Sequence, residues 1–235
     1  MEHENSFLYG PANALWHSVQ HRFGWDIPDH VIMALLVLVI STVLFGIGSR
    51  NISRDNPGPL QHFMEMVVGG LKGLLHDVIG HGSERYLTII AAFAVFIFIA
   101  NMFGLFFFLQ PPTSNVNTTF ALSISAFLYY NIEGIRRQGL LGYLKHFMGP
   151  VLWLAPLMFF IEMIGNFARV LSLGVRLFGN IFGEHTATGI FTGLVPVIAP
   201  MPMMALGIFG ALLQTYVFIM LTTVYIAGAV AAEEH

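Results

Sequence analysis

The sequence predicts an all-α integral membrane protein, on the strength of its composition and its long apolar stretches. Of the 235 residues, 56% are hydrophobic and only 10% are charged, and the mean hydropathy is +0.73. A soluble chain carries about a quarter charged residues, so this one could not cover itself with polar surface in water. Several apolar stretches reach the roughly 20 residues that a helix needs to cross a bilayer. We therefore expect about five membrane helices and one interfacial helix, in a single membrane domain over residues 27–235.

The chain begins with a segment that does not resemble a membrane helix. Residues 1–26 are polar and mixed in charge, without the basic region and apolar core of a cleaved signal peptide. We interpret them as an extracytoplasmic segment before the first span, at residues 27–48. After a turn-rich stretch, residues 61–79 carry apolar side chains at helical spacing, interrupted by charged and histidine side chains. This pattern predicts a helix that lies in the membrane interface or caps the bundle.

The next two spans are predicted at residues 86–109 and 118–135. Residues 110–117 (QPPTSNVN) separate them, because two adjacent prolines cannot continue a helix. Asn101 is a polar side chain in an otherwise apolar span, so we expect it to face protein rather than lipid. Residues 136–146 are interpreted as a basic loop.

Two long apolar tracts complete the chain, over residues 151–194 and 202–232. The first is longer than one perpendicular crossing requires, so it holds either two short spans or one strongly tilted helix. No strong Gly-Pro break occurs between Pro156 and Gly189, which favours one long tilted helix.

The distribution of basic residues predicts the orientation. They gather after the first and third spans, as Arg50, Arg54, Arg136, Arg137 and Lys145. Residues 110–117 and 195–202 contain no lysine or arginine. Because cytoplasmic loops carry an excess of basic residues, five crossings place the N-terminus outside and the C-terminus in the cytoplasm.

A stripe of polar residues interrupts the fourth span. On a helix its members share an arc of about 80°, over a length of about 33 Å. They are Glu162, Asn166, Arg169, Arg176, Asn180 and Glu184. For Glu162 and Arg169, a structural explanation (a surface ion pair, or a side chain that reaches an interface) is as well supported as a functional role. Arg176 lies near the middle of the tract, where a lone arginine costs at least about 2.5–3.5 kcal/mol, so a functional role is favoured.

The chemistry of arginine restricts what Arg176 can do. A guanidinium does not release its proton in proteins, so it is a fixed positive charge rather than a proton carrier. Such a charge lowers the pKa of a carboxylic acid brought beside it. Arg176 would therefore make a proton-handling station if a partner supplied a moving acid. On the last span, Gln214 and Tyr225 share one side, and Gln214 could hydrogen-bond a guanidinium or simply join two helices.

At these residues the sequence resembles subunit a of the F-type ATP synthases, the stator of their membrane motor. The resemblance rests on PLMFFIE (156–162), SLGVRLFGN (172–180), LQTYVFIMLTTVYI (213–226), NMFGL (101–105) and the terminal EEH. It covers the chain from about Pro57 to the end. It implies a bacterial inner membrane and a last helix pair that forms a long tilted hairpin against the rotor.

The resemblance also implies partners and a mechanism. The partners are a ring of small hairpin c subunits with one membrane carboxylate each, the peripheral-stalk b subunits and the rest of the F1Fo complex. Protons would enter by one half-channel, ride the ring, and leave by a second half-channel, driving ATP synthesis in the head.

Individual residues take roles from the same resemblance. It implies that Arg176 is the essential charge and Gln214 its neighbour, and that Glu184 and His185 lie in the outer half-channel. Channel-lining or ring-proximal positions are implied for Asn180, Glu162 and Ser172, and the predicted proton-translocation set also includes Tyr225 and Asn101. One departure concerns the last helix, where many members have His or Glu seven residues before the glutamine and this chain has Gly207. The inlet must then be arranged differently, through Glu184 with His185.

Other function classes are less well supported. A secondary ion transporter or antiporter would use the stripe for its own substrate, but we find no inverted repeats. A membrane metalloenzyme is disfavoured because the chain lacks HExxH and cysteine, and His17 and His21 are better read as solvated or interfacial. No P-loop is present, and the basic segments resemble orientation signals rather than a nucleic-acid surface. We therefore predict no cofactor, no metal site and no nucleic-acid partner.

Overall fold

The structure is a computed structural model that describes residues 28–50, 58–105, 111–148, 153–194 and 200–230. Within these ranges the chain is helical almost throughout and contains no strand, which confirms the predicted all-α class. The longer helices are α2 (Asp29–Arg50), α3 (Pro59–Ile79), α4 (Leu87–Met102), α5 (Val116–Met148), α6 (Ala155–Leu194) and α7 (Pro200–Val230). Three short 3-10 turns join them: η1 (Ser83–Tyr86), η2 (Phe103–Leu105) and η3 (Pro112–Ser114).

Three of the helical segments are long and apolar enough to cross a membrane. They are Ser83–Leu105, Ala155–Phe191 and Met201–Val230. The apolar part of α2, His30–Gly46, is shorter, and α5 contains the predicted span 118–135 without belonging to this group. Helices therefore occur at all five predicted spans, while membrane crossing at residues 27–48 and 118–135 stays a prediction.

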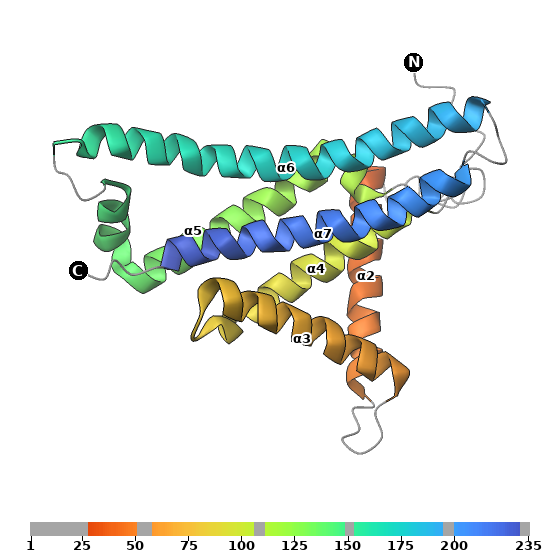
Figure 1. The fold of residues 1–235 in the computed structure, drawn as a ribbon, viewed down its shortest axis with the longest axis horizontal. Helices are drawn as coiled ribbons and strands as arrows, with labels where there is room; N and C mark the ends of the chain where they lie inside the picture. The colour runs from red at the N-terminus through yellow and green to blue at the C-terminus, as the bar shows by residue number, and fades with distance from the viewer. Residues whose placement is uncertain (1–27, 51–57, 106–110, 149–152, 195–199, 231–235) are drawn as a thin grey trace, which may run out of the picture.

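Helices α6 and α7 form the long hairpin of the molecule. They run antiparallel along its longest axis, with α5 and α4 crossing beneath them (Figure 1). The 40 residues of α6 form one helix. This confirms the prediction of one long helix rather than two short spans. At 1.5 Å per residue such a helix measures about 60 Å, twice the hydrocarbon thickness, so it fits a bilayer only when strongly tilted.

The predicted basic loop at 136–146 is wrong, because this segment is helical. Helix α5 continues to Met148 and changes direction at Gly139, whose φ of 73° and ψ of 162° are not helical. Glycine has no Cβ, so it can adopt this conformation without steric cost and allow helical turns on either side. The last part of α5 thereby folds back, and its direction reverses at the end of the helix in Figure 1. The ring of Tyr143 then packs directly on Gly134.

Helix α3 matches the predicted helix at 61–79. Pro59 occupies its first turn, where a missing N–H costs nothing, and Gly80 ends it with a φ of 82°. One side buries Leu71 and Leu75, while Phe63 remains exposed. The helix is thus confirmed, and its position in the membrane interface stays a prediction.

One core holds α4, α5, α6 and α7 together. Its fully buried members include Ile90 and Ile97 of α4, Leu177 of α6 and Phe218 of α7. The ring of Phe218 packs against that of Phe93, at 5.6 Å between centroids. This core fixes how α6 lies against α7, and so positions the polar residues that the two helices share.

Candidate functional site

Arg176 and Gln214 lie on facing helices and line the same cleft. The cleft encloses about 560 Å³ between α6 and α7 and is open to the surface. Arg176 and Asn180 come from α6, one helical turn apart, and Gln214 comes from α7. The walls are apolar or glycine: Val175, Gly179, Leu213 and Val217. The cleft therefore combines one fixed positive charge with two neutral amides.

The guanidinium of Arg176 is not neutralised within the part of the chain that the structure describes. Arg176 is exposed, and among the described residues it forms neither an ion pair nor a hydrogen bond. Gln214 is buried, at 4% exposure, and offers an amide that cannot cancel the charge. Its position in the same cleft agrees with the predicted neighbour relation. The arrangement leaves a full positive charge available to an anion from outside the chain.

Glu184 of α6 lies against two glycines of α7. A Cβ placed on Gly207 would overlap Oε1 of Glu184, so the carboxylate occupies the space of a missing side chain. A Cβ on Gly210 would lie 3.6 Å from Oε2 of Glu184 and 3.7 Å from Nδ2 of Asn180. Asn180 thus lines the Arg176 cleft and also lies beside the Glu184 carboxylate. The departure at position 207 becomes intelligible, because glycine there makes room for Glu184.

His185 and Asn101 lie near one another at the same end of the hairpin. Nε2 of His185 lies 2.9 Å from the point where a Cβ on Gly104 would be, and Pro111 lies beside the same point. Asn101, one turn before Gly104, is buried and accepts a hydrogen bond of 2.8 Å from the hydroxyl of Thr113. The Nδ2 atom of Asn101 is buried and has no hydrogen-bond partner among the residues that the structure describes. Asn101 faces protein, as the sequence predicted.

At the other end of the stripe, Arg169 and Glu162 form an ion pair. Nη2 of Arg169 donates to Oε1 of Glu162 at 2.9 Å, and both side chains are more than one third exposed (37% and 39%). The guanidinium also lies over the ring of Tyr225, 5.6 Å from its centroid. A pair this exposed adds little stability. Arg169 thus contacts both the Glu162 carboxylate and the Tyr225 ring.

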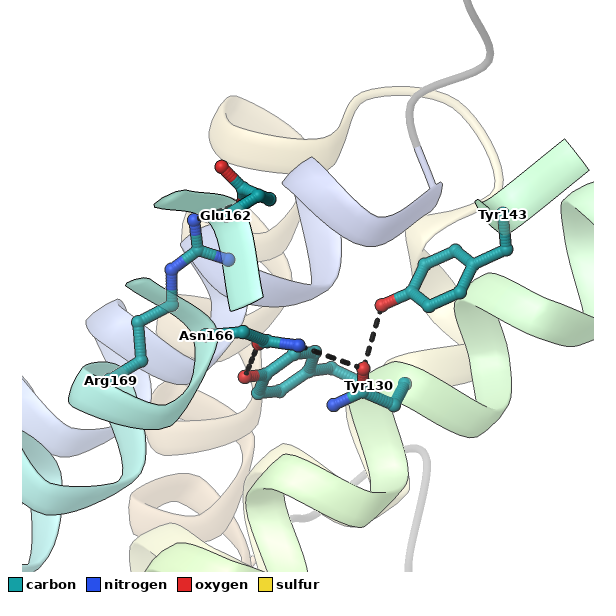
Figure 2. Close-up of polar contacts among 6 residues, drawn as sticks. Tyr130, Tyr143, Glu162, Asn166 and Arg169 are labelled. Atoms are coloured by element: carbon teal, nitrogen blue, oxygen red, sulfur yellow. Dashed lines mark hydrogen bonds and ion pairs between the residues drawn. The ribbon is translucent and has the colours of Figure 1, made fainter. Parts of the chain in front are cut away.

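A buried hydrogen-bond network next to this pair joins α5 to α6 (Figure 2). The hydroxyl of Tyr130 donates to Oδ1 of Asn166, and Nδ2 of Asn166 donates to Oδ1 of Asn131 at 3.2 Å. The hydroxyl of Tyr143 donates to the same Asn131 oxygen at 2.7 Å. The ring of Tyr130 packs against that of Tyr225, so three helices meet here. We call these four hydrogen-bonded side chains, Tyr130, Asn131, Tyr143 and Asn166, the Tyr-Asn network.

The sequence analysis missed most of this network. Only Asn166 belonged to the predicted stripe, and Tyr143 fell in the predicted loop. Polar side chains at positions 130 and 131, within the predicted span 118–135, were the available signal. Their partner could not be identified, because Tyr143 reaches Asn131 only through the change of direction at Gly139.

The polar residues of the predicted stripe on α6 do not all face the same neighbouring helix. Asn166 faces α5, Arg169 and Glu162 bond each other, and Asn180 and Glu184 face α7. Ser172 is exposed on α6, and no described contact joins it to the other site residues. Within the described ranges, no three histidine, aspartate or glutamate side chains are grouped as metal ligands.

Comparison with known proteins identifies the family to which the sequence of this chain is similar. Residues 30–227 match the family model described as ATP synthase A chain. ATP synthase subunit a of Geotalea uraniireducens (strain Rf4) is 40% identical over 201 residues, which are 86% of this chain and 87% of the relative. That of Geotalea daltonii (strain DSM 22248 / JCM 15807 / FRC-32) is 42% identical over 206 residues, 88% of each chain. That of Sulfurihydrogenibium sp. (strain YO3AOP1) is 41% identical over 207 residues, 88% of this chain and 99% of the relative. The chain therefore belongs to the ATP synthase subunit a family.

Proposed function

We propose that this chain is the stator of a proton-driven rotary motor and that Arg176 is its essential charge. The observation that carries the proposal is the unpaired Arg176 guanidinium in an open cleft between two long apolar helices. A buried or lipid-exposed arginine is costly, and within the described chain nothing offsets this cost. An acid on a neighbouring rotor would offset it each time the rotor turned past.

The physical role of Arg176 follows from its permanent charge. A protonated rotor acid arriving from lipid would lose its proton beside the guanidinium, because the positive charge stabilises the carboxylate. The acid would need a proton again before re-entering lipid. The same charge would repel protons, and so prevent a direct leak between the two half-channels. Moving one elementary charge across 100 mV releases about 2.3 kcal/mol, which rotation can deliver to an ATP-making head.

The outer half-channel is proposed to run along Glu184, His185 and Asn101. Two features support this. The Glu184 carboxylate lies next to Asn180, which lines the Arg176 cleft. Asn101 has a buried amide hydrogen-bond donor without a partner in the described part of the chain, which is the kind of group that an ordered water satisfies.

The inner half-channel is proposed at the Glu162 end of α6. There a carboxylate, a guanidinium and the Tyr225 phenol lie together, partly exposed. Glu162 is the proposed proton acceptor on this side, and Arg169 holds its carboxylate in place. Ser172, between the two ends, is proposed to lie near the rotor surface.

The partners and location follow from the family. We propose a ring of c subunits facing the Arg176 cleft, b subunits of the peripheral stalk, and the remainder of an F1Fo complex. The three relatives compared above come from bacteria, which supports a bacterial inner membrane. The unequal distribution of basic residues supports an external N-terminus and a cytoplasmic C-terminus.

The test is Arg176→Ala in the assembled complex. We expect proton-driven ATP synthesis in inverted vesicles to be lost while the complex purifies with its usual subunits. Arg136→Ala is the matched control, because Arg136 is an exposed arginine that pairs with Glu133 at 3.1 Å, away from the cleft. Normal synthesis by the Arg176 variant contradicts the proposal. Ion or solute transport by the chain reconstituted alone would instead favour a secondary transporter.

A further inference from the structure

Two arginines from different helices converge beside the turn that joins α3 to α4. The point where a Cβ on Gly82 would lie is 3.5 Å from Nη2 of Arg85 and 4.0 Å from Nη2 of Arg137. Arg85 belongs to the η1 turn before α4, and Arg137 to α5, so the fold brings them together over 52 residues of sequence. Neither guanidinium can lose its proton, so an anion bound between them would be attracted by both charges and would offset their repulsion.

Nearby acids do not serve as that anion. Glu84 lies 3.6 Å from Lys72, and Glu133 lies 3.1 Å from Arg136. Within the described ranges, neither Arg85 nor Arg137 forms an ion pair. The acids of this region are therefore engaged with other cations, and the two converging guanidiniums are left without one.

Arg85 is held in place in a way that leaves its outer nitrogens available. Its Nε donates to the carbonyl oxygen of Gly82 at 3.2 Å, and its guanidinium lies 5.9 Å from the centre of the Tyr86 ring. Gly82 has a φ of 81°, a conformation that favours glycine and turns its carbonyl toward this arginine. The two terminal nitrogens of Arg85 form no hydrogen bond with a described residue, and one of them, Nη2, lies close to Nη2 of Arg137.

The position of the pair indicates where its ligand comes from. Arg85 lies at the first turn of the apolar segment Ser83–Leu105, and Arg137 lies two residues beyond the predicted span 118–135. Both are exposed near the start of α4 and within α5, and Tyr86 and Tyr129 of the same two segments pack edge to face. Tyrosines and basic side chains at the ends of membrane helices mark the headgroup layer. A separate cleft of about 290 Å³ lies against the same turn and is lined by Lys72, His76 and Ser83 together with the carboxylate of Glu84.

We propose that Arg85 and Arg137 form a binding site for the phosphate of an anionic phospholipid. Guanidinium groups bind phosphate oxygens through paired, charge-assisted hydrogen bonds, and basic pockets between membrane helices bind lipid headgroups. The bound lipid bridges the start of α4 to α5 and removes the repulsion between the two arginines. The site is remote from the Arg176 cleft and does not depend on the proposed motor function.

Binding is tested on the purified full-length chain in neutral detergent. Dioctanoyl phosphatidylglycerol is the anionic probe, dioctanoyl phosphatidylcholine the zwitterionic one, and native mass spectrometry measures the affinity of each. We expect Arg85→Gln and Arg137→Gln each to weaken phosphatidylglycerol binding about tenfold, the loss of roughly one charge-assisted hydrogen bond. Arg136→Gln removes an equal charge one residue away and should change the affinity less than twofold. Phosphatidylcholine should bind weakly and equally to all four proteins.

Three outcomes would overturn the proposal. An equal loss in the Arg136 variant would mean that only net charge matters. Undiminished phosphatidylglycerol binding in both glutamine variants would mean that the lipid does not use this site. Displacement of the lipid by an equal concentration of inorganic phosphate would make free phosphate the ligand. Should a glutamine variant fail to fold, the double variant Arg85→Lys with Arg137→Lys carries the test, since it keeps both charges. It should bind a few-fold more weakly because an ammonium lacks the planar fork, and unchanged affinity would contradict a two-guanidinium site.

Discussion

The Glu184 carboxylate on α6 occupies the space that a side chain at position 207 of α7 would fill. The Glu184 carboxylate can take this position only because residue 207 has no side chain. A substitution at position 207 would therefore displace Glu184 on the facing helix. The same notch continues at Gly210, where Asn180 joins Glu184. The position of Glu184, the acid proposed for the outer half-channel, thus depends on the absence of a side chain on the opposite helix.

Gly207→Ala tests this relation. The added methyl group should displace the Glu184 carboxylate and reduce proton-driven ATP synthesis several-fold. Glu184→Asp in the same chain shortens the acid by one methylene and should restore part of the rate. Gly228→Ala is the matched control on α7, because a Cβ there meets nothing within 4 Å and should be neutral or slightly stabilising. A wild-type rate for the Gly207 variant would mean that the carboxylate moves freely or is not used.

Gln214→Leu tests the amide beside Arg176. Leucine has a similar volume but carries no amide, so the Arg176 cleft would lose a polar group that could accept a hydrogen bond from the guanidinium as the rotor passes. We expect a partial loss of coupled ATP synthesis, smaller than the loss caused by Arg176→Ala. The rate of synthesis and the passive proton leak of inverted vesicles are measured together. If both equal those of the wild type, Gln214 serves only as a contact between helices.

His185→Ala tests the second proposed inlet residue. Removing the imidazole should slow ATP synthesis most strongly at a low imposed driving force, where proton supply limits the rate. Thr186→Ala is the control, since Thr186 is an exposed neighbour whose hydroxyl bonds only to Phe182 of its own helix, at 2.8 Å. The measurement is synthesis rate against imposed proton gradient, and superimposable curves for His185→Ala and wild type contradict the role.

Tyr130→Phe tests the Tyr-Asn network. The variant keeps the ring but leaves Oδ1 of the buried Asn166 without its donor, which should lower the free energy of unfolding by about 1 kcal/mol. Tyr129→Phe is the matched control, because the Tyr129 hydroxyl forms no hydrogen bond with a described residue. Unfolding in detergent, followed by circular dichroism, gives the comparison. Equal stability of the two variants would show that the Tyr130 hydrogen bond contributes nothing.

Much of the architecture could be read from local sequence. Apolar length predicted the helices, and the missing break between Pro156 and Gly189 predicted that α6 is one helix. The segment after 135 was misread because basic residues suggested a loop. Leu140 and Leu141 instead continue the helix after a single non-helical glycine. Local composition does not distinguish a helix that changes direction from a helix that ends.

The sequence by itself determined that a permanently charged residue, Arg176, stands in a helix too apolar to neutralise it. That conclusion needs only the chemistry of arginine and the hydropathy of its neighbours. Tertiary structure alone decided which neighbours each polar residue meets. Asn166 and Arg169 are close on one helix, yet the first bonds to α5 and the second to Glu162. The physical reason is that helical periodicity sets the direction of a side chain, while its partner depends on how a second helix crosses and on where, as at Gly207, that helix leaves room.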